Sequence, residues 1–189
     1  MKPLKYSLTL IILLLCLENE HASAQFTRYG GGLSFSSGIE ETTPDRIETG
    51  NPGVTFRGVY EFNDDFFIIP GITLYLPKVA ADLSDNVKTY YGHFDACLAY
   101  KMAHQGPIMF YGMAGADLTG MFLSYEKVSD NNKSLISPGF TLGTGMEMII
   151  DLNFNAFVQA RYVVAKYQYL VISIGAHYYW DGRRFRTWH

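Results

Sequence analysis

Residues 90–101 read Tyr-Tyr-Gly-His-Phe-Asp-Ala-Cys-Leu-Ala-Tyr-Lys, and in this stretch every second residue changes character. Phe94 and Leu98 fall on one phase, whereas His93 and Asp95 fall on the other. Successive side chains of a β-strand point to opposite faces, so a period of two indicates a strand with one apolar and one polar face. The stretch is also unusually long for a strand of a soluble domain.

The same alternation recurs on both sides of this stretch and predicts an all-β fold with eight strands. Their ranges are about 26–38, 53–62, 66–77, 87–102, 107–124, 135–150, 155–165 and 169–180. The connections alternate in length. Tight turns are predicted at 63–65, 103–106 and 151–154, and longer polar loops at 39–52, 78–86 and 125–134. Long strands joined by short turns on one side and long loops on the other are typical of an antiparallel up-and-down transmembrane β-barrel, with the short turns in the periplasm.

The composition agrees with a wall that carries few charges. Of 189 residues, 17% are charged, below the roughly 25% of ordinary soluble domains, and 15% are aromatic. The formal net charge of −3 argues against nucleic acid as a partner, since nucleic-acid-binding domains are normally basic. The outward phase of the strands is rich in Phe, Leu, Ile, Ala and Gly, whereas a soluble sandwich would carry Lys and Glu there.

The first 24 residues carry the pattern of a secretory signal peptide. Lys2 and Lys5 precede an apolar core at 8–17, and small residues lead to an expected cleavage site after Ala24. The core is too short to span a bilayer as a helix. The mature chain would keep one cysteine, Cys97, so no internal disulfide is expected.

Aromatic residues concentrate at the strand ends, where the rings of membrane barrels form girdles at the two interfaces. They are Tyr60, Phe62, Phe66, Tyr75, Tyr90, Tyr100, Phe110, Phe122, Tyr125, Tyr169, Tyr178 and Trp180.

The charged residues occupy the opposite phase and are expected to fill the barrel interior as a polar network. They are Arg57, Glu61, His93, Asp95, Lys101, Asp117, Glu147, Gln159, Arg161 and His177. An interior of eight strands has room only for side chains, so these groups must pair. If the turns lie at 103–106 and 151–154, His93 comes within reach of Asp117, and Glu147 lies opposite residue 157 or 159, with Arg161 one diagonal step away.

The His93-x-Asp95 pair also permits a catalytic interpretation, because some outer-membrane barrels are enzymes that act on lipids or peptides. Such a site needs a third group near the outer rim, and Ser124, Ser129 and Ser134 share no recognisable spacing with His93. His104 lies in a predicted turn without companions that would hold a metal. The sequence therefore predicts no catalytic residue, no metal site and no cofactor.

The last predicted strand resembles the terminal signal that the barrel assembly machinery recognises. That signal has a polar residue, a glycine, an aromatic or apolar residue and a final aromatic residue at fixed spacing, which Ser173, Gly175, Tyr178 and Trp180 match. Proteins with this signal usually end on the aromatic residue, whereas nine residues follow here. The resemblance implies a barrel over residues 25–180 and a periplasmic tail at 181–189.

Taken whole, residues 25–180 resemble the small outer-membrane β-barrels of the OmpA and OmpX type. They are most similar in style to the "outer membrane protein beta-barrel domain" or porin family of Bacteroidetes, which includes the PorT proteins of type IX secretion. The resemblance implies a Gram-negative outer membrane, with lipid and the assembly machinery as partners. A structural, adhesive or accessory role without catalysis is expected, with loops 39–52 and 125–134 contacting an envelope or extracellular protein. A secretion accessory, a lipid-modifying enzyme and a small-solute porin remain as alternatives.

Overall fold

The computed structural model describes residues 25–37, 51–81, 86–125, 133–166 and 168–179, and nearly all of them lie in strands. The strands are β1 (Gln25–Ser36), β2 (Asn51–Glu61), β3 (Phe66–Tyr75), β4 (Lys78–Ala81), β5 (Asn86–Gln105), β6 (Ile108–Tyr125), β7 (Lys133–Asp151), β8 (Phe154–Val164) and β9 (Tyr169–Tyr179). The predicted signal peptide and the predicted tail at 181–189 lie outside the described residues. No helix in the described part is long and apolar enough to cross a membrane.

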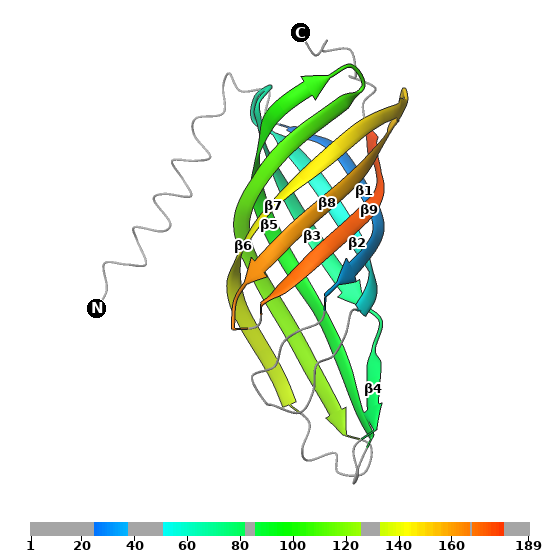
Figure 1. Cartoon of the computed structure of the whole chain (residues 1–189), viewed down its shortest axis with the longest axis vertical. Coiled ribbons are helices and arrows are strands. Elements are labelled where there is room, and N and C mark those ends of the chain that lie inside the picture. Colours follow the sequence, from blue (N-terminus) through cyan, green and yellow to red (C-terminus); the bar gives the residue numbers. More distant parts are fainter. Residues whose placement is uncertain (1–24, 38–50, 82–85, 126–132, 167, 180–189) are drawn as a thin grey trace, which may run out of the picture.

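The strands close into one antiparallel barrel (Figure 1). Each strand pairs with its neighbour in the chain, and β1 pairs with β9 to complete the ring. Both β3 and β4 pair with β5, one after the other, so the nine strands occupy eight positions around the barrel. The predicted eight-stranded barrel is therefore confirmed, and the 78–86 segment contains a short strand that the sequence pattern did not predict.

The predicted turn at 103–106 is wrong. β5 continues to Gln105, and the chain reverses at Gly106 and Pro107. Gly106 has a φ of 59°, a left-handed conformation that glycine adopts at little cost. A β-bulge between Lys101 and Ala103 adds one residue to β5 relative to β6. The turn and the bulge together move the whole β5–β6 register away from the predicted one.

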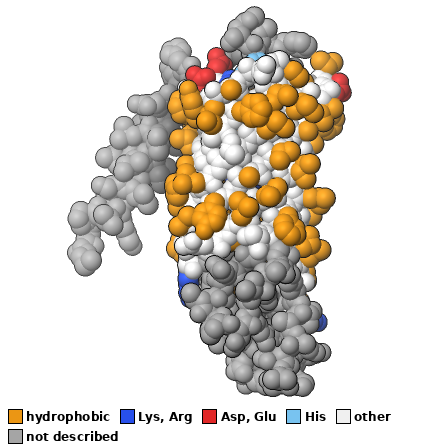
Figure 2. Space-filling view, in the orientation of Figure 1, with side chains coloured by type: hydrophobic (Ala, Val, Ile, Leu, Met, Phe, Trp, Pro, Cys, Tyr) orange, Lys and Arg blue, Asp and Glu red, His pale blue; other side chains and the backbone are white. Residues whose placement is uncertain are grey.

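The two faces of the wall differ as the alternation predicts. Outward side chains are apolar and exposed, among them Leu33, Ile136 and Ile174, and Figure 2 shows hydrophobic side chains over the described wall. Inward side chains are buried. Tyr75 and Tyr169, predicted to be girdle residues, are instead buried in the interior, because they fall on the inward phase of β3 and β9.

Glycines let large inward rings pack in this narrow interior. A Cβ atom added to Gly145 would lie 2.4 Å from the ring of Tyr111. A Cβ atom at Gly175 would lie 2.8 Å from the ring of Phe157. Because both rings are fully buried, these two glycines are positions where a side chain would displace the core.

Three strands are much longer than the others. β5, β6 and β7 have 20, 18 and 19 residues, whereas β1, β2, β3, β8 and β9 have 10 to 12. The connections between β2 and β3, β5 and β6, and β7 and β8 are short, and they gather at one end of the barrel, called the turn end here (Figure 1). At the opposite loop end, β4 and the extra lengths of β5, β6 and β7 project beyond the remaining strands.

Candidate functional site

The structure buries most of the polar residues that the alternation assigns to the interior. Eight of the ten are at most 3% exposed: Arg57, His93, Asp95, Asp117, Glu147, Gln159, Arg161 and His177. Glu61 and Lys101 are half-buried near the turn end. Six of these eight residues belong to two clusters, one toward each end of the barrel, whereas Arg57 and Gln159 donate to Thr55 and Tyr111.

The turn-end cluster is built around Glu147 of β7. Arg28 of β1 donates from Nη2 to Glu147 Oε2 at 3.1 Å, and its Nε lies 3.0 Å from Oε1. Arg28 also forms an ion pair with Glu61. His177 Nδ1 lies 3.1 Å from Glu147 Oε1, and Asn155 Nδ2 donates to the same oxygen at 3.0 Å. Five side chains from five strands therefore hold one another in place.

The loop-end cluster is built around Asp95 of β5. Arg161 of β8 lies across the barrel, and its Nη1 is 2.5 Å from Asp95 Oδ2. Arg161 Nη2 lies 3.3 Å from His93 Nε2. Since a guanidinium only donates, this His93 nitrogen accepts, and the imidazole is neutral with its proton on Nδ1. That nitrogen lies 3.4 Å from Tyr169 Oη.

The loop-end cluster continues through hydroxyl groups to a second carboxylate. Tyr169 Oη lies 2.6 Å from Thr119 Oγ1, and Thr119 donates to Asp117 Oδ1 at 2.7 Å. Toward the loop end, the ring of Tyr75 stacks on that of Tyr91 with their centroids 4.1 Å apart. Tyr91 in turn meets the ring of Tyr169 edge-on. The packed rings and the hydrogen bonds fill this half of the interior.

The predicted pairings differ from those in the structure. His93 lies opposite Thr119, so it does not face Asp117 as predicted. The turn and the bulge cause this difference because they shift the register. Glu147 does lie opposite Phe157, one of the two predicted positions, but its cation is Arg28 and not Arg161.

Sequence reasoning missed Arg28 as an interior residue. Arg28, Gly30, Gly32 and Ser34 share one phase of β1, and Leu33 stands on the other, so the alternation could have placed Arg28 inside.

Other candidate residues have structural surroundings. Cys97 is a buried free thiol that donates to Asp95 Oδ2 at 3.6 Å. Arg57 donates from Nε to Thr55 Oγ1 at 3.3 Å, and its guanidinium lies 6.0 Å from the centroid of the Phe157 ring. Ser124 is half-buried and Ser134 is exposed at the loop end, whereas Ser129 lies outside the described residues.

The described part of the predicted assembly signal lies on β9. Ser173 is buried, and its hydroxyl lies 2.7 Å from the hydroxyl of Ser34 across the closing seam. Gly175 packs against β1, and the ring of Tyr178 contacts those of Tyr29 and Phe154. Trp180 lies outside the described residues.

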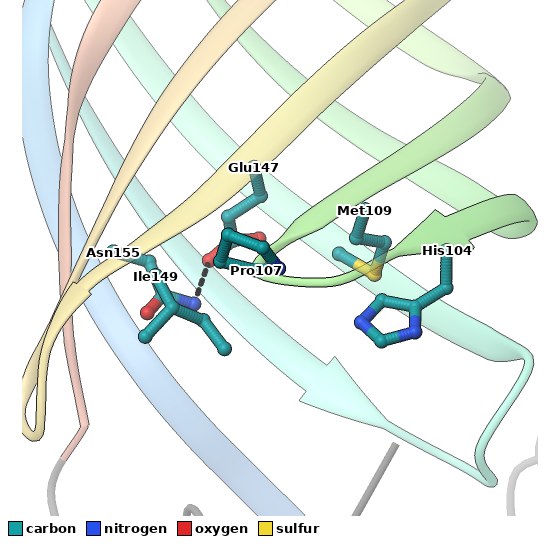
Figure 3. Close-up of a pocket in the computed structure, with 6 residues that line it drawn as sticks. All are labelled: His104, Pro107, Met109, Glu147, Ile149 and Asn155. Atoms are coloured by element: carbon teal, nitrogen blue, oxygen red, sulfur yellow. Dashed lines mark hydrogen bonds between the residues drawn. The ribbon is translucent and has the colours of Figure 1, made fainter. Parts of the chain in front are cut away.

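A small pocket opens at the turn end, below Glu147 (Figure 3). It is lined by His104, Pro107, Met109, Glu147, Ile149 and Asn155. Among the described residues, no group of three or more His, Cys, Asp or Glu side chains is placed to hold a metal ion.

Comparison with known proteins connects this architecture to a family. Residues 7–182 match the family described as "Outer membrane protein beta-barrel domain". The chain belongs to this family of outer-membrane β-barrels. No curated protein matches the sequence.

Solved structures share the fold at low sequence identity. Neisserial surface protein A is 17% identical, with a TM-score of 0.61 over 84% of this chain and 99% of its own. OprG of Pseudomonas aeruginosa is 14% identical, with a TM-score of 0.58 over 85% of this chain and 97% of its own. Ail, the attachment invasion locus protein of Yersinia pestis, is 14% identical, with a TM-score of 0.57 over 82% of this chain and 100% of its own.

Membership of the family places the barrel in the outer membrane of a Gram-negative bacterium. The exposed apolar wall of the barrel then faces lipid. In outer-membrane barrels the short turns face the periplasm and the longer loops face outward. By this rule we expect the turn end to be periplasmic and the projecting ends of β4, β5, β6 and β7 to stand on the cell surface.

Proposed function

We propose that this outer-membrane barrel is a non-catalytic surface protein whose projecting sheet contacts an extracellular or envelope partner. The observation that carries the proposal is the difference in strand length. β5, β6 and β7 exceed the other full-length strands by six to ten residues, which corresponds to about 20–30 Å along each strand. A barrel that only had to span the membrane would not need this length.

The interior supports a structural role over catalysis or conduction. His93 and Asp95, the pair that sequence reasoning weighed as catalytic, are both held by Arg161. A serine hydrolase would need the His93 Nδ1 proton to be held by a carboxylate and Nε2 to face a nucleophile. Here Nδ1 lies beside a tyrosine hydroxyl and Nε2 beside a guanidinium.

The same packing argues against a pore. Ion pairs, hydrogen bonds and stacked rings occupy both halves of the interior, from the turn-end cluster around Glu147 to the stacked Tyr75 and Tyr91. Eight strands leave an interior that side chains can fill.

The likeness to Ail suits a role in surface attachment, since the name of that protein records attachment and invasion. At 14% identity the likeness concerns the fold alone. The proposal therefore rests on this chain's own projecting sheet.

Protease treatment of intact cells tests the orientation, and a loop exchange tests the role. Protease added to cells should cut the chain at its loop end and leave the segment around residues 101–111 protected. Replacing residues 126–132 with a short Gly-Ser linker should reduce adherence of the cells to host or bacterial surfaces while the barrel still folds. The matched control replaces residues 63–65 at the turn end with a linker of equal length.

Three outcomes would contradict the proposal: cleavage only after the periplasm is opened, unchanged adherence of the loop variant, or equal loss in both variants. Isolation of the barrel in a stable complex with secretion components, with adherence unchanged, would favour the accessory role instead.

A further inference from the structure

The β-bulge in β5 reverses the direction of the residues that follow it. Before the bulge, odd-numbered residues such as Cys97 and Ala99 point inward. After it, Ala103 pairs with the outward Phe110, and His104 pairs with the buried Met109. The extra residue therefore turns His104 from the lipid side to the interior side at the periplasmic mouth. Bulges commonly re-aim a side chain in this way beside functional sites.

The pairing brings an imidazole and a thioether together. Directly opposed residues on one face of an antiparallel pair have their Cβ atoms about 5 Å apart. Both side chains line the pocket at the turn end, and Figure 3 shows the Met109 sulfur beside the His104 ring. Met109 is 4% exposed, whereas His104 is accessible from the periplasmic side.

A third donor faces the same space. Asn155 is 2% exposed and lines the pocket. Its amide nitrogen donates to Glu147 and Tyr179, whereas its Oδ1 atom has no hydrogen-bond partner. A buried carbonyl oxygen without a partner carries a desolvation cost that a cation would remove. The cavity measures about 10 Å³, which suits one small ion or one water molecule.

From this geometry we infer that the periplasmic mouth binds a single soft monovalent metal cation, Cu(I) or its analogue Ag(I). The Met109 sulfur and a ring nitrogen of His104 would be its ligands, with Asn155 Oδ1 beside them. Thioether and imidazole ligands favour Cu(I), whereas harder divalent ions favour carboxylates and water.

The charges of the pocket favour a monovalent ion over a divalent one. Glu147, the carboxylate that lines the pocket, is already bound by Arg28, His177 and Asn155. A divalent ion would require further carboxylates, and the described residues place no group of three His, Cys, Asp or Glu there. Pro107 and Ile149 complete the lining with apolar surface.

Silver titration of the barrel purified from outer membranes tests this site. The protein carries ¹³C-methyl methionine, and silver nitrate is added in chloride-free buffer while the methyl signals are followed by NMR. One equivalent of Ag(I) should shift the Met109 methyl signal and leave that of Met102, which is 67% exposed on the outer wall, in place. His104→Gln should weaken binding by at least roughly tenfold.

Two further variants separate this site from other silver ligands. Met109→Leu, which removes the sulfur while keeping the side-chain volume, should abolish binding at one equivalent, whereas Met102→Leu should leave it unchanged. Cys97→Ala should also leave it unchanged, since the buried thiol is not part of the pocket. Gel mobility of unboiled samples shows that each variant is folded. Binding that survives Met109→Leu, binding that disappears in Cys97→Ala, or equal shifts of Met102 and Met109 would overturn the inference.

Discussion

Removing the Arg161 guanidinium should destabilise the barrel strongly, because it leaves a buried carboxylate without its main cation. Asp95 and Arg161 have side chains that are 0% exposed, and they lie 2.5 Å apart. Breaking a buried ion pair costs about 3–5 kcal/mol. In Arg161→Met the aliphatic volume is kept. Asp95 also retains the hydrogen bond from the Cys97 thiol, whose sulfur lies 3.6 Å from Oδ2. We therefore expect the free energy of unfolding to fall by about 3 kcal/mol, near the lower end of that range. This corresponds to more than a hundredfold in the unfolding equilibrium constant.

Urea unfolding in lipid vesicles measures this loss, because the folded barrel should migrate differently from the unfolded chain on an unboiled detergent gel. Asp95→Asn and the double variant complete a thermodynamic cycle. The stability lost in the double variant should be about 2 kcal/mol smaller than the sum of the losses in the two single variants. Asp64→Asn, an exposed turn position, should change stability by less than about 0.5 kcal/mol. If Arg161→Met costs less than about 1 kcal/mol and the cycle shows additivity, the ion pair does not hold the two walls together.

Further tests address packing, conduction and assembly. Gly145→Ala should lower the free energy of unfolding by about 1–3 kcal/mol because its Cβ displaces Tyr111. Gly120→Ala is the control and should cost little, since a Cβ there meets nothing within 4 Å. Equal urea midpoints of the two variants would contradict this packing. Planar bilayers containing the barrel should show no sustained conductance on the nanosiemens scale, and a stable open level would disprove the filled interior. Tyr178→Ser should lower the amount of barrel in outer membranes without lowering its refolding yield in detergent; a parallel fall in both would assign Tyr178 to stability alone.

The strand pattern could be predicted from the sequence because the side-chain period of a strand is fixed at two. Residues such as His93 and Phe94 must therefore face opposite sides wherever the strand lies in the barrel. The pairings could not be predicted in the same way. The register of β5 against β6 depends on one extra residue between Lys101 and Ala103, and alternation over a long strand does not reveal it.

The central ion pair was also beyond sequence reasoning. Asp95 of β5 and Arg161 of β8 lie on strands that are not neighbours, so no ladder register relates them. They meet because a barrel of eight strands is narrow enough for side chains from opposite walls to touch. The inward position of Arg28 could have been predicted, because Arg28 shares one phase of β1 with Gly30 and Gly32.

The seam between β1 and β9 has a consequence for how the protein reaches its membrane. Arg28 of β1 lies opposite Tyr179 of β9. One edge of β1, the first described strand, therefore stays unpaired until β9, the last described strand, is present. Closing a loop of about 150 residues costs roughly 4 kcal/mol of chain entropy beyond a constant. No ring can form while the C-terminal strand is still being synthesised. Until then β1 has an unpaired edge, which in hydrocarbon would leave backbone groups unsatisfied. Until β9 is in place the chain therefore remains an open, aggregation-prone polypeptide, and the barrel closes only at the end of its assembly.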